Sequence, residues 1–410
     1  MKITKLCTFA TALGLLFTSC NRDEVNELPT GPSVELGQGL LNVVLLDESG
    51  VLTKATPDYY EGGTPEEREI HKLDFFVFNS DGSFNTHYTT TDISGTTYGF
   101  NVTEGTGLKV VAAVNIAGDL RTLAPISQAE LIATIYDQQI ITPTRIPQGG
   151  VPMSGTSPAF SVANGEQVLT SVEVARILAR FNAPTISDEL SVRITADAEV
   201  DSIKVLLGEA IDFNKLRFAY KGHVVINGLK KSFYLPNYGS GGESSRWDRD
   251  VWTIGNDLSN YTASEYEDNE LGEVYSGGSF LTNNEVVYLY ENCPEYVPSV
   301  EGSLSGYARD KVYSMIVEGD LYEEGNESNR VTRYWRINVS KTNSESSIFK
   351  ILRNSIYKVE IEKIVTAGYG TPGEAEEGGG GGPIPGLEDA GIIVGIDILE
   401  WRVFEEGTDI

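Results

Sequence analysis

The stretch "GIIVGIDILEWRVF", residues 391–404, is strongly apolar and stands close to the C-terminus. A run of five glycines, residues 378–382, precedes it and is followed by prolines. A single strand can neither bury a face nor pair its own backbone groups, so it requires the edge of a sheet. We therefore predict a slack Gly/Pro/acidic linker over residues 368–390 and a detachable strand region over residues 391–410.

Alternation within this stretch predicts which side chains the sheet would bury. Four residues share one face, and burial of each would contribute roughly 1.5–3 kcal/mol; they are Ile392, Val394, Ile396 and Ile398. Trp401 and Val403 follow on the opposite parity. A β-bulge, or a division into two short strands, would explain the change of face.

Composition limits the class of protein. The chain has 410 residues, enough for two domains, and it is rich in Tyr and Gly, which favours strands and turns. Its net charge of −28 argues against nucleic acid as a partner, because phosphate binding requires a basic face. Only three cysteines occur, so the sequence predicts neither a disulfide framework nor a cysteine metal site.

The N-terminus has the pattern of an export signal. Lys2 and Lys5 precede an apolar segment that ends just before Cys20, so residues 1–19 are predicted to be a signal peptide. The sequence "LLFTSC" resembles a bacterial lipobox, which implies acylation of Cys20 and an outer-membrane lipid anchor on the precursor. An ordinary secretory signal is the alternative. Residues 20–37 are predicted to be a polar tether.

Short apolar runs separated by turn residues predict two β-sandwiches with one or two short helices. The first strand is expected at residues 39–46, followed by a polar loop at residues 51–69. The segment "SQAELIATIYDQQ" begins with a capping box, Ser127 and Glu130, and predicts a helix. The segment "SVRITADAEVDSIKVLLGEA", residues 191–210, is interpreted as strand. We place the N-terminal domain at residues 38–183 and the C-terminal domain at residues 184–367.

No motif in the sequence predicts an enzyme, a metal site or a cofactor. The three histidines are scattered, and "GYGTPG", residues 368–373, matches a dinucleotide fingerprint without the helix that should follow it. Cys293 lacks a nearby histidine in sequence. The aromatic and polar segment at residues 234–252 could bind a sugar or a protein, but an ordinary surface loop is the simpler interpretation.

Several blocks, taken in order, resemble the fimbrillins, the lipoprotein-derived major subunits of protease-assembled (type V) fimbriae of Gram-negative bacteria. They are "VPMSG" (residues 151–155), "VEVARILARF" (172–181), "INGLKKSFYLP" (226–236), "YLYEN" (288–292), "ILRNSIYKVEI" (351–361) and "IDILEWRV" (396–403). The resemblance implies two transthyretin-like β-sandwiches. It also implies export as a lipoprotein, removal of the first strand by a trypsin-like protease, and head-to-tail polymerisation by donor-strand exchange.

The resemblance assigns roles to particular residues of this chain. Cleavage is expected at Lys54, where the family usually has arginine, with Arg68 as the fallback. The displaced strand would carry Leu40, Leu41, Val43, Val44, Leu45 and Leu46, and the C-terminal strand residues named above would be the donors. The expected partners are identical or related subunits, the processing protease, and a host protein or glycan. An accessory tip or anchor adhesin, or a surface glycan-binding lipoprotein or enzyme acting alone, is the alternative.

Overall fold

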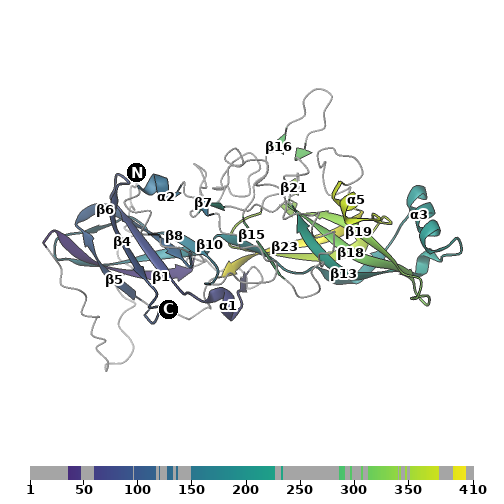
Figure 1. The fold of residues 1–410 in the computed structure, drawn as a ribbon, viewed down its shortest axis with the longest axis horizontal. Coiled ribbons are helices and arrows are strands. Elements are labelled where there is room, and N and C mark those ends of the chain that lie inside the picture. The colour runs from purple at the N-terminus through teal and green to yellow at the C-terminus, as the bar shows by residue number, and fades with distance from the viewer. Residues whose placement is uncertain are drawn as a thin grey trace, which may run out of the picture.

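The chain forms an elongated molecule built of two β domains joined end to end (Figure 1). The computed structural model describes residues 36–47, 60–95, 97–116, 120, 127–132, 135–136, 149–226, 232–233, 286–290, 296–297, 306–307, 313–339, 341–342, 347–348, 351–377 and 391–402. Strands dominate these residues, so the predicted mainly β fold with sandwich-like sheets is confirmed.

The N-terminal domain is one eight-stranded sheet that curls around its own core. Seven strands follow in the order β4-β3-β6-β8-β10-β1-β5, and β9 pairs with β6. Their bounds are β1 Gln38–Asp47, β3 Leu73–Phe78, β4 Phe84–Thr90, β5 Thr97–Thr103, β6 Gly105–Val114, β8 Met153–Thr156, β9 Phe160–Val162 and β10 Gln167–Arg176. The side chain of Asn85 on β4 bonds to both the amide and the carbonyl of Thr103 on β5, so it joins the two ends of the sheet.

The C-terminal domain packs two sheets face to face. The first has the order β15-β11-β22-β23-β2, with β12 also paired to β22, and the second has the order β13-β18-β19. Trp335, Tyr357 and Met315 are fully buried in the core between them. The bounds are β2 Tyr60–Gly62, β11 Leu178–Phe181, β12 Thr185–Val192, β13 Leu216–Ile226, β15 Val287–Tyr290, β18 Ser314–Glu323, β19 Val331–Asn338, β22 Ser355–Ile364 and β23 Ile392–Arg402.

Three two-stranded ribbons complete the described strands. Each pairs two residues with two others and none joins the main sheets. They are β7 (Ile135–Tyr136) with β14 (Ser232–Phe233), β16 (Tyr296–Val297) with β17 (Gly306–Tyr307), and β20 (Lys341–Thr342) with β21 (Ser347–Ile348).

The described ranges contain more helix than the sequence predicts. The predicted capping box at Ser127 and Glu130 is present, but helix α2 (Gln128–Ile132) is short, and Ile135 already lies in β7. Helix α3 (Asp197–Leu207) replaces the strand expected from residue 197 onward. Its Ile203 and Leu207 recur at helical spacing and are buried against the C-terminal core. Helices α1 (Pro65–Arg68) and α5 (Pro372–Glu377), and a 3₁₀ turn (Phe213–Lys215), are further additions.

Helix α5 corrects the prediction of an irregular linker from residue 368. Thr371 and Glu374 exchange the two hydrogen bonds of a capping box, and Pro372 occupies the first turn, where its missing N–H costs nothing. Ala375 is fully buried and fixes the helix against β18 and β19.

The chain passes from one sheet to the other at Ile177, between β10 and β11, which is earlier than the predicted boundary at residues 183 and 184. Ile177 and Leu178 lie in a junction cluster that includes Phe76 and Phe78 of the N-terminal domain and Tyr288, Tyr290, Ile356 and Leu399 of the C-terminal domain. The two domains therefore share an apolar core where they meet. No helix in the described ranges combines the length and the apolarity that crossing a bilayer requires.

Gly155 provides a test of the packing inside the N-terminal sheet. It lies on β8 between Val174 and Ala112, and a Cβ there would sit 1.8 Å from the carbonyl oxygen of Glu173. Because the obstacle is backbone, we expect Gly155→Ala to destabilise the domain by about 3 kcal/mol or more. Denaturant unfolding measures the loss. Gly373→Ala is the matched control, since nothing lies within 4 Å of its Cβ; an equal loss in both variants would contradict the packing argument.

Candidate assembly site

The first strand lies inside the N-terminal sheet. Strand β1 pairs in parallel with β10 from Leu40 to Asp47 and antiparallel with β5 from Gln38 to Val44. It is therefore an interior strand, although it is the first element described in the chain. Its two partners do not pair with each other in the strand order, so β1 is the strand that lies between them.

Burial of the displaced-strand residues follows the alternation of a strand. Leu41, Val43 and Leu45 point into the N-terminal core and are at most 3% exposed. On the other face Leu40 is also buried, whereas Val44 and Leu46 are half-buried. Gly39 fits closely against Val162, because a Cβ there would lie 2.1 Å from that side chain. The site of β1 is thus a shaped apolar groove.

Removal of β1 would leave this groove with two unpaired edges. The facing backbone groups of β10 and β5 would lose their hydrogen-bond partners, and each such buried group costs about 1–3 kcal/mol. The core residues beneath Leu41, Val43 and Leu45 would become exposed at the same time. An extended apolar strand restores both kinds of contact, which is the physical basis of strand addition.

The C-terminal strand has a place within its own chain. Strand β23 pairs antiparallel with β22 from Ile392 opposite Ile364 to Glu400 opposite Ser355. The expectation of a tethered strand without a sheet of its own is therefore wrong for this structure. The reason is that β22 offers an apolar face of matching length, which the sequence of the tail could not reveal. Donation of β23 to another subunit would first require it to leave β22.

Side chains along β23 face two different cores. Ile392 is buried in the C-terminal core, and Val394 and Ile396 pack against it. Leu399, on the opposite face, packs against the junction cluster. Strand β23 thus passes from one core to the other, and in the described residues its register continues past Ile398 without a bulge or a division into two strands. The register irregularity lies on β22 instead, between Ile361 and Lys363.

Other predicted residues lie partly outside the described ranges. Cys20, Lys54, Val403, Cys293 and the segment 234–252 fall outside them, and for Ile398 and Trp401 the structure describes the backbone only. Arg68 is described: it is the last residue of α1. Proteases bind their substrates in extended form, so cleavage after Arg68 would first require α1 to unfold.

Helix α1 is held by a buried carboxylate that the sequence did not single out. Glu67 is 1% exposed. Its carboxylate accepts hydrogen bonds from Arg180 Nη1 at 3.1 Å, Tyr288 Oη at 2.5 Å and the Thr64 amide at 2.7 Å. Arg176 also donates to the Glu67 carbonyl at 3.2 Å. In the sequence, the capping box "TPEE" indicates the start of the helix. The sequence does not indicate the partners of Glu67 on β10, β11 and β15, because they are distant along the chain.

The Tyr288 hydroxyl is the member of this network whose pKa is shifted. Burial, together with the hydrogen bond to Glu67, raises the pKa of the Tyr288 hydroxyl. The hydroxyl therefore remains protonated at neutral pH and continues to donate to Glu67. Arg180 places its positive charge against the same carboxylate, so the two buried charges compensate each other. Removal of the carboxylate would take away the countercharge that lies 3.1 Å from Arg180.

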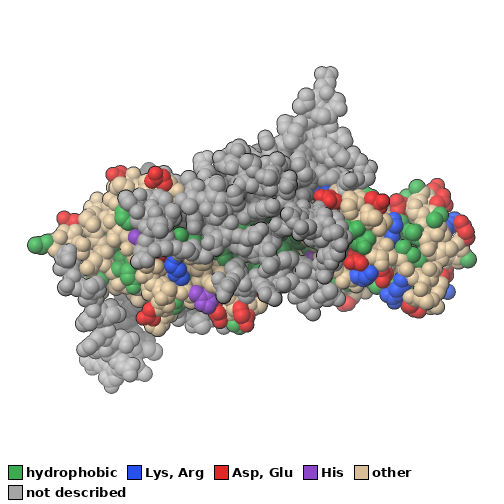
Figure 2. Space-filling view, viewed as in Figure 1, with side chains coloured by type: hydrophobic (Ala, Val, Ile, Leu, Met, Phe, Trp, Pro, Cys, Tyr) green, Lys and Arg blue, Asp and Glu red, His purple; other side chains and the backbone are tan. Residues whose placement is uncertain are grey.

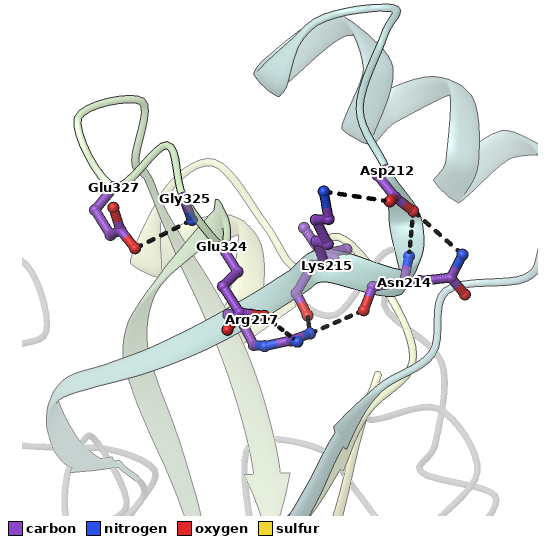
Figure 3. Close-up of polar contacts among 8 residues, drawn as sticks. Asp212, Asn214, Lys215, Arg217, Glu324, Gly325 and Glu327 are labelled. Atoms are coloured by element: carbon purple, nitrogen blue, oxygen red, sulfur yellow. Dashed lines mark hydrogen bonds and ion pairs between the residues drawn. The ribbon is translucent and has the colours of Figure 1, made fainter.

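A further polar cluster lies at the outer end of the C-terminal domain. There, Asp212 accepts from the Asn214 amide, and Arg217 pairs with Glu324 (Figure 3). On the face shown in Figure 2, acidic and basic side chains intermingle over this end of the molecule. Within the described ranges no group of three or more potential ligands could hold a metal ion.

The glycine motif at residues 368–373 has no free anion site. Helix α5 does begin there, against the expectation from sequence. However, the Glu374 carboxylate already accepts from the amides of Gly370 and Thr371 at 2.9 and 3.1 Å. These are the amides that would otherwise face a phosphate, so the motif serves as a helix cap.

Comparison with known proteins connects this architecture to fimbriae. Residues 41–197 match the family model for the major fimbrial subunit protein (FimA), while no curated protein sequence matches the chain. A candidate cell adhesion protein from Parabacteroides distasonis has a similar fold, with a TM-score of 0.53 at 14% identity, covering 90% of this chain and 98% of that one. A fimbrilin (fimA) from Porphyromonas gingivalis gives a TM-score of 0.51 at 14% identity, covering 91% and 100%. Residues 41–197 are thus similar to the major fimbrial subunit proteins, and the overall fold of the chain is that of the fimbrilins.

Proposed function

We propose that this fimbrial protein is a structural pilin that polymerises head to tail by donor-strand exchange at the cell surface. Its precursor is exported as a lipoprotein acylated at Cys20 and anchored in the outer membrane. A protease then cuts the loop that follows β1, and the strand leaves with the lipid. The vacated groove takes β23 of the next subunit. The family match supports a structural role rather than catalysis.

The position of β1 carries this proposal. It is an interior strand in the sheet but lies at the N-terminal edge of the described chain, and residues 48–59 are all that connect it to β2. A single cut in that segment separates β1 covalently from the rest of the sheet. Few interior strands can be removed in this way, because most are continued by chain at both ends.

Exchange of β23 between two sheets is energetically reasonable. In its own chain β23 already buries Ile392, Val394 and Ile396 and pairs its backbone with β22. Transfer to another sheet replaces these contacts with similar ones, so the strand itself gains little. The favourable part comes from the acceptor, whose groove between β10 and β5 is otherwise open on both sides, and it must exceed the cost to the donor, whose β22 loses one partner strand. Removal of β1 is therefore the step that makes exchange favourable.

The geometry of the exchange predicts a fibre rather than a closed ring. The groove is in the N-terminal domain and the donor strand is in the C-terminal domain, so each contact joins unlike surfaces. Such heterologous contacts continue indefinitely when the rotation between subunits does not close. The elongated shape in Figure 1 then sets the long axis of each repeat.

The docking of β23 on its own β22 also favours a second candidate, a surface glycan-binding lipoprotein that acts alone. In that case β23 is the permanent last strand of the C-terminal domain and residues 378–390 are an ordinary connection. An accessory tip or anchor adhesin of the same fimbrium is related to the first proposal. Immunogold labelling along the fibre supports a shaft subunit, whereas labelling at one end supports the accessory role.

A cut introduced into the folded chain tests the proposal. Residues 52–57 are replaced with the recognition site of a specific endoprotease, in a chain that begins at residue 21. We expect the uncut protein to stay monomeric and the cut protein to form polymers in light scattering and electron microscopy. Excess peptide of residues 38–47 should slow growth, because it competes for the groove.

A shuffled version of the same peptide is the control for this competition. It has the same composition but loses the alternation that places Leu41, Val43 and Leu45 on one face. If the cut chain loses β1 and remains monomeric, with β23 still protected, the pilin proposal fails and the stand-alone candidate is favoured.

A further inference from the structure

Strand β2 lies against the end of β23. Its three residues pair in parallel with that strand: Tyr60 opposite Glu400, Glu61 opposite Trp401 and Gly62 opposite Arg402. On the other side, β22 reaches only as far as Glu400, opposite Ser355. Within the described ranges, β2 is therefore the sole strand partner of Trp401 and Arg402.

Strand β2 is itself held by the helix that follows it. Gly62 is separated from the N-cap Thr64 only by Gly63, which is buried. The helix is fixed at the domain junction by Glu67, through Arg180 of β11 and Tyr288 of β15. A three-residue strand could not stay paired alone, so its position depends on this anchor.

We propose that β2 and α1, residues 60–68, form a clasp that keeps the end of β23 in its own sheet, with Glu67 as the anchor. Opening of the clasp is then the first step in the release of β23, because Trp401 and Arg402 lose their strand partner and Glu400 keeps only β22. Residues 392–396 depend on β22 instead and open later. The clasp deepens the proposed function, because it sets how readily the donor strand becomes available.

The cleavage site decides whether the mature subunit keeps the clasp. A cut after Lys54 leaves β2 and α1 attached to the body of the subunit, so β23 remains held until the anchor opens. A cut after Arg68 would remove both elements together with β1. It would also strip Arg180 and Tyr288 of their shared partner, Glu67. The clasp thus predicts slow, controlled exchange after the first cut and rapid exchange after the second.

Hydrogen–deuterium exchange of the full monomeric chain tests the clasp without reference to polymers. Glu67→Ala removes the carboxylate that accepts from Arg180, Tyr288 and the Thr64 amide, so we expect peptides covering residues 60–64 and 399–402 to exchange at least about tenfold faster. Peptides from β1 and β18 should keep their wild-type rates. Glu66→Ala is the matched control, since Glu66 is the exposed neighbour on the same helix and should change neither region.

A milder variant keeps the test decisive if Glu67→Ala loosens the whole protein. Tyr288→Phe removes one hydrogen bond to Glu67 and should accelerate the same two regions to a smaller extent. Wild-type exchange at residues 399–402 in Tyr288→Phe, or equal acceleration in Glu66→Ala, overturns the clasp. One outcome separates the clasp from the proposed function. If Glu67→Ala opens the end of β23 but the cut Glu67→Ala chain polymerises at the wild-type rate, the clasp is supported and donation of β23 is contradicted.

Discussion

A disulfide between residues 358 and 397 should stop polymer growth, and a reductant should restore it. Lys358 on β22 and Asp397 on β23 are directly opposite each other, and both side chains are exposed. Opposed residues of antiparallel strands lie about 4.5–5.5 Å apart at Cα, within the range that a disulfide spans. The bond would fix β23 in its own sheet without filling the groove of the N-terminal domain.

The experiment uses Lys358→Cys with Asp397→Cys in the cleavable chain that begins at residue 21 and carries Cys293→Ala. Oxidised protein should remain monomeric after the cut, and reduced protein should form fibres, as followed by light scattering. A disulfide between residues 320 and 332 is the control. Thr332 donates to Asp320 across β18 and β19, so this bond forms in the same domain but leaves β23 free. Fibres that grow equally well from the oxidised 358–397 protein would show that β23 is not the donor.

Processing should occur after Lys54 and not after Arg68. Arg68 ends a helix whose Glu67 is buried and paired with Arg180, so a protease would have to unfold the segment and break that pair before binding it. Breaking a buried ion pair costs about 3–5 kcal/mol, which lowers the accessible population by more than about a hundredfold. Lys54 lies in the segment between β1 and β2. We therefore expect Lys54→Ala to abolish release of β1 and, with it, assembly.

Mass spectrometry of subunits from surface fibres identifies their N-terminal residue and so tests this prediction. The wild-type N-terminus should be Ala55, and Lys54→Ala should leave the precursor uncut. Arg68→Ala is the matched control and should be processed normally, since it removes the other basic candidate of the same loop. An N-terminus at Glu69 in wild-type fibres would contradict the prediction and would mean that the mature subunit lacks β2 and α1.

Local features of the fold were largely readable from the sequence. The apolar run bounded by turn residues predicts strand β1, whereas only the structure shows that Leu41, Val43 and Leu45 form its core face. The capping box at Ser127 was recognised, and the same pattern at Thr64 and Thr371 marks α1 and α5. Helix α3 was missed because its Val and Ile residues suit a strand as well as a helix, and a short apolar run does not separate the two.

The sequence by itself determined that both ends of this chain carry apolar strands, since alternation and flanking turn residues are properties of neighbouring residues. The tertiary structure alone decided where those strands lie. Strand β1 is interior because residues more than a hundred positions away, on β10, lie beside it, and β23 rests on β22 rather than on another molecule. Likewise, Glu67 became an anchor only through Arg180 and Tyr288. Apolar strands and single carboxylates have many possible partners, and only the packing of the whole chain selects one.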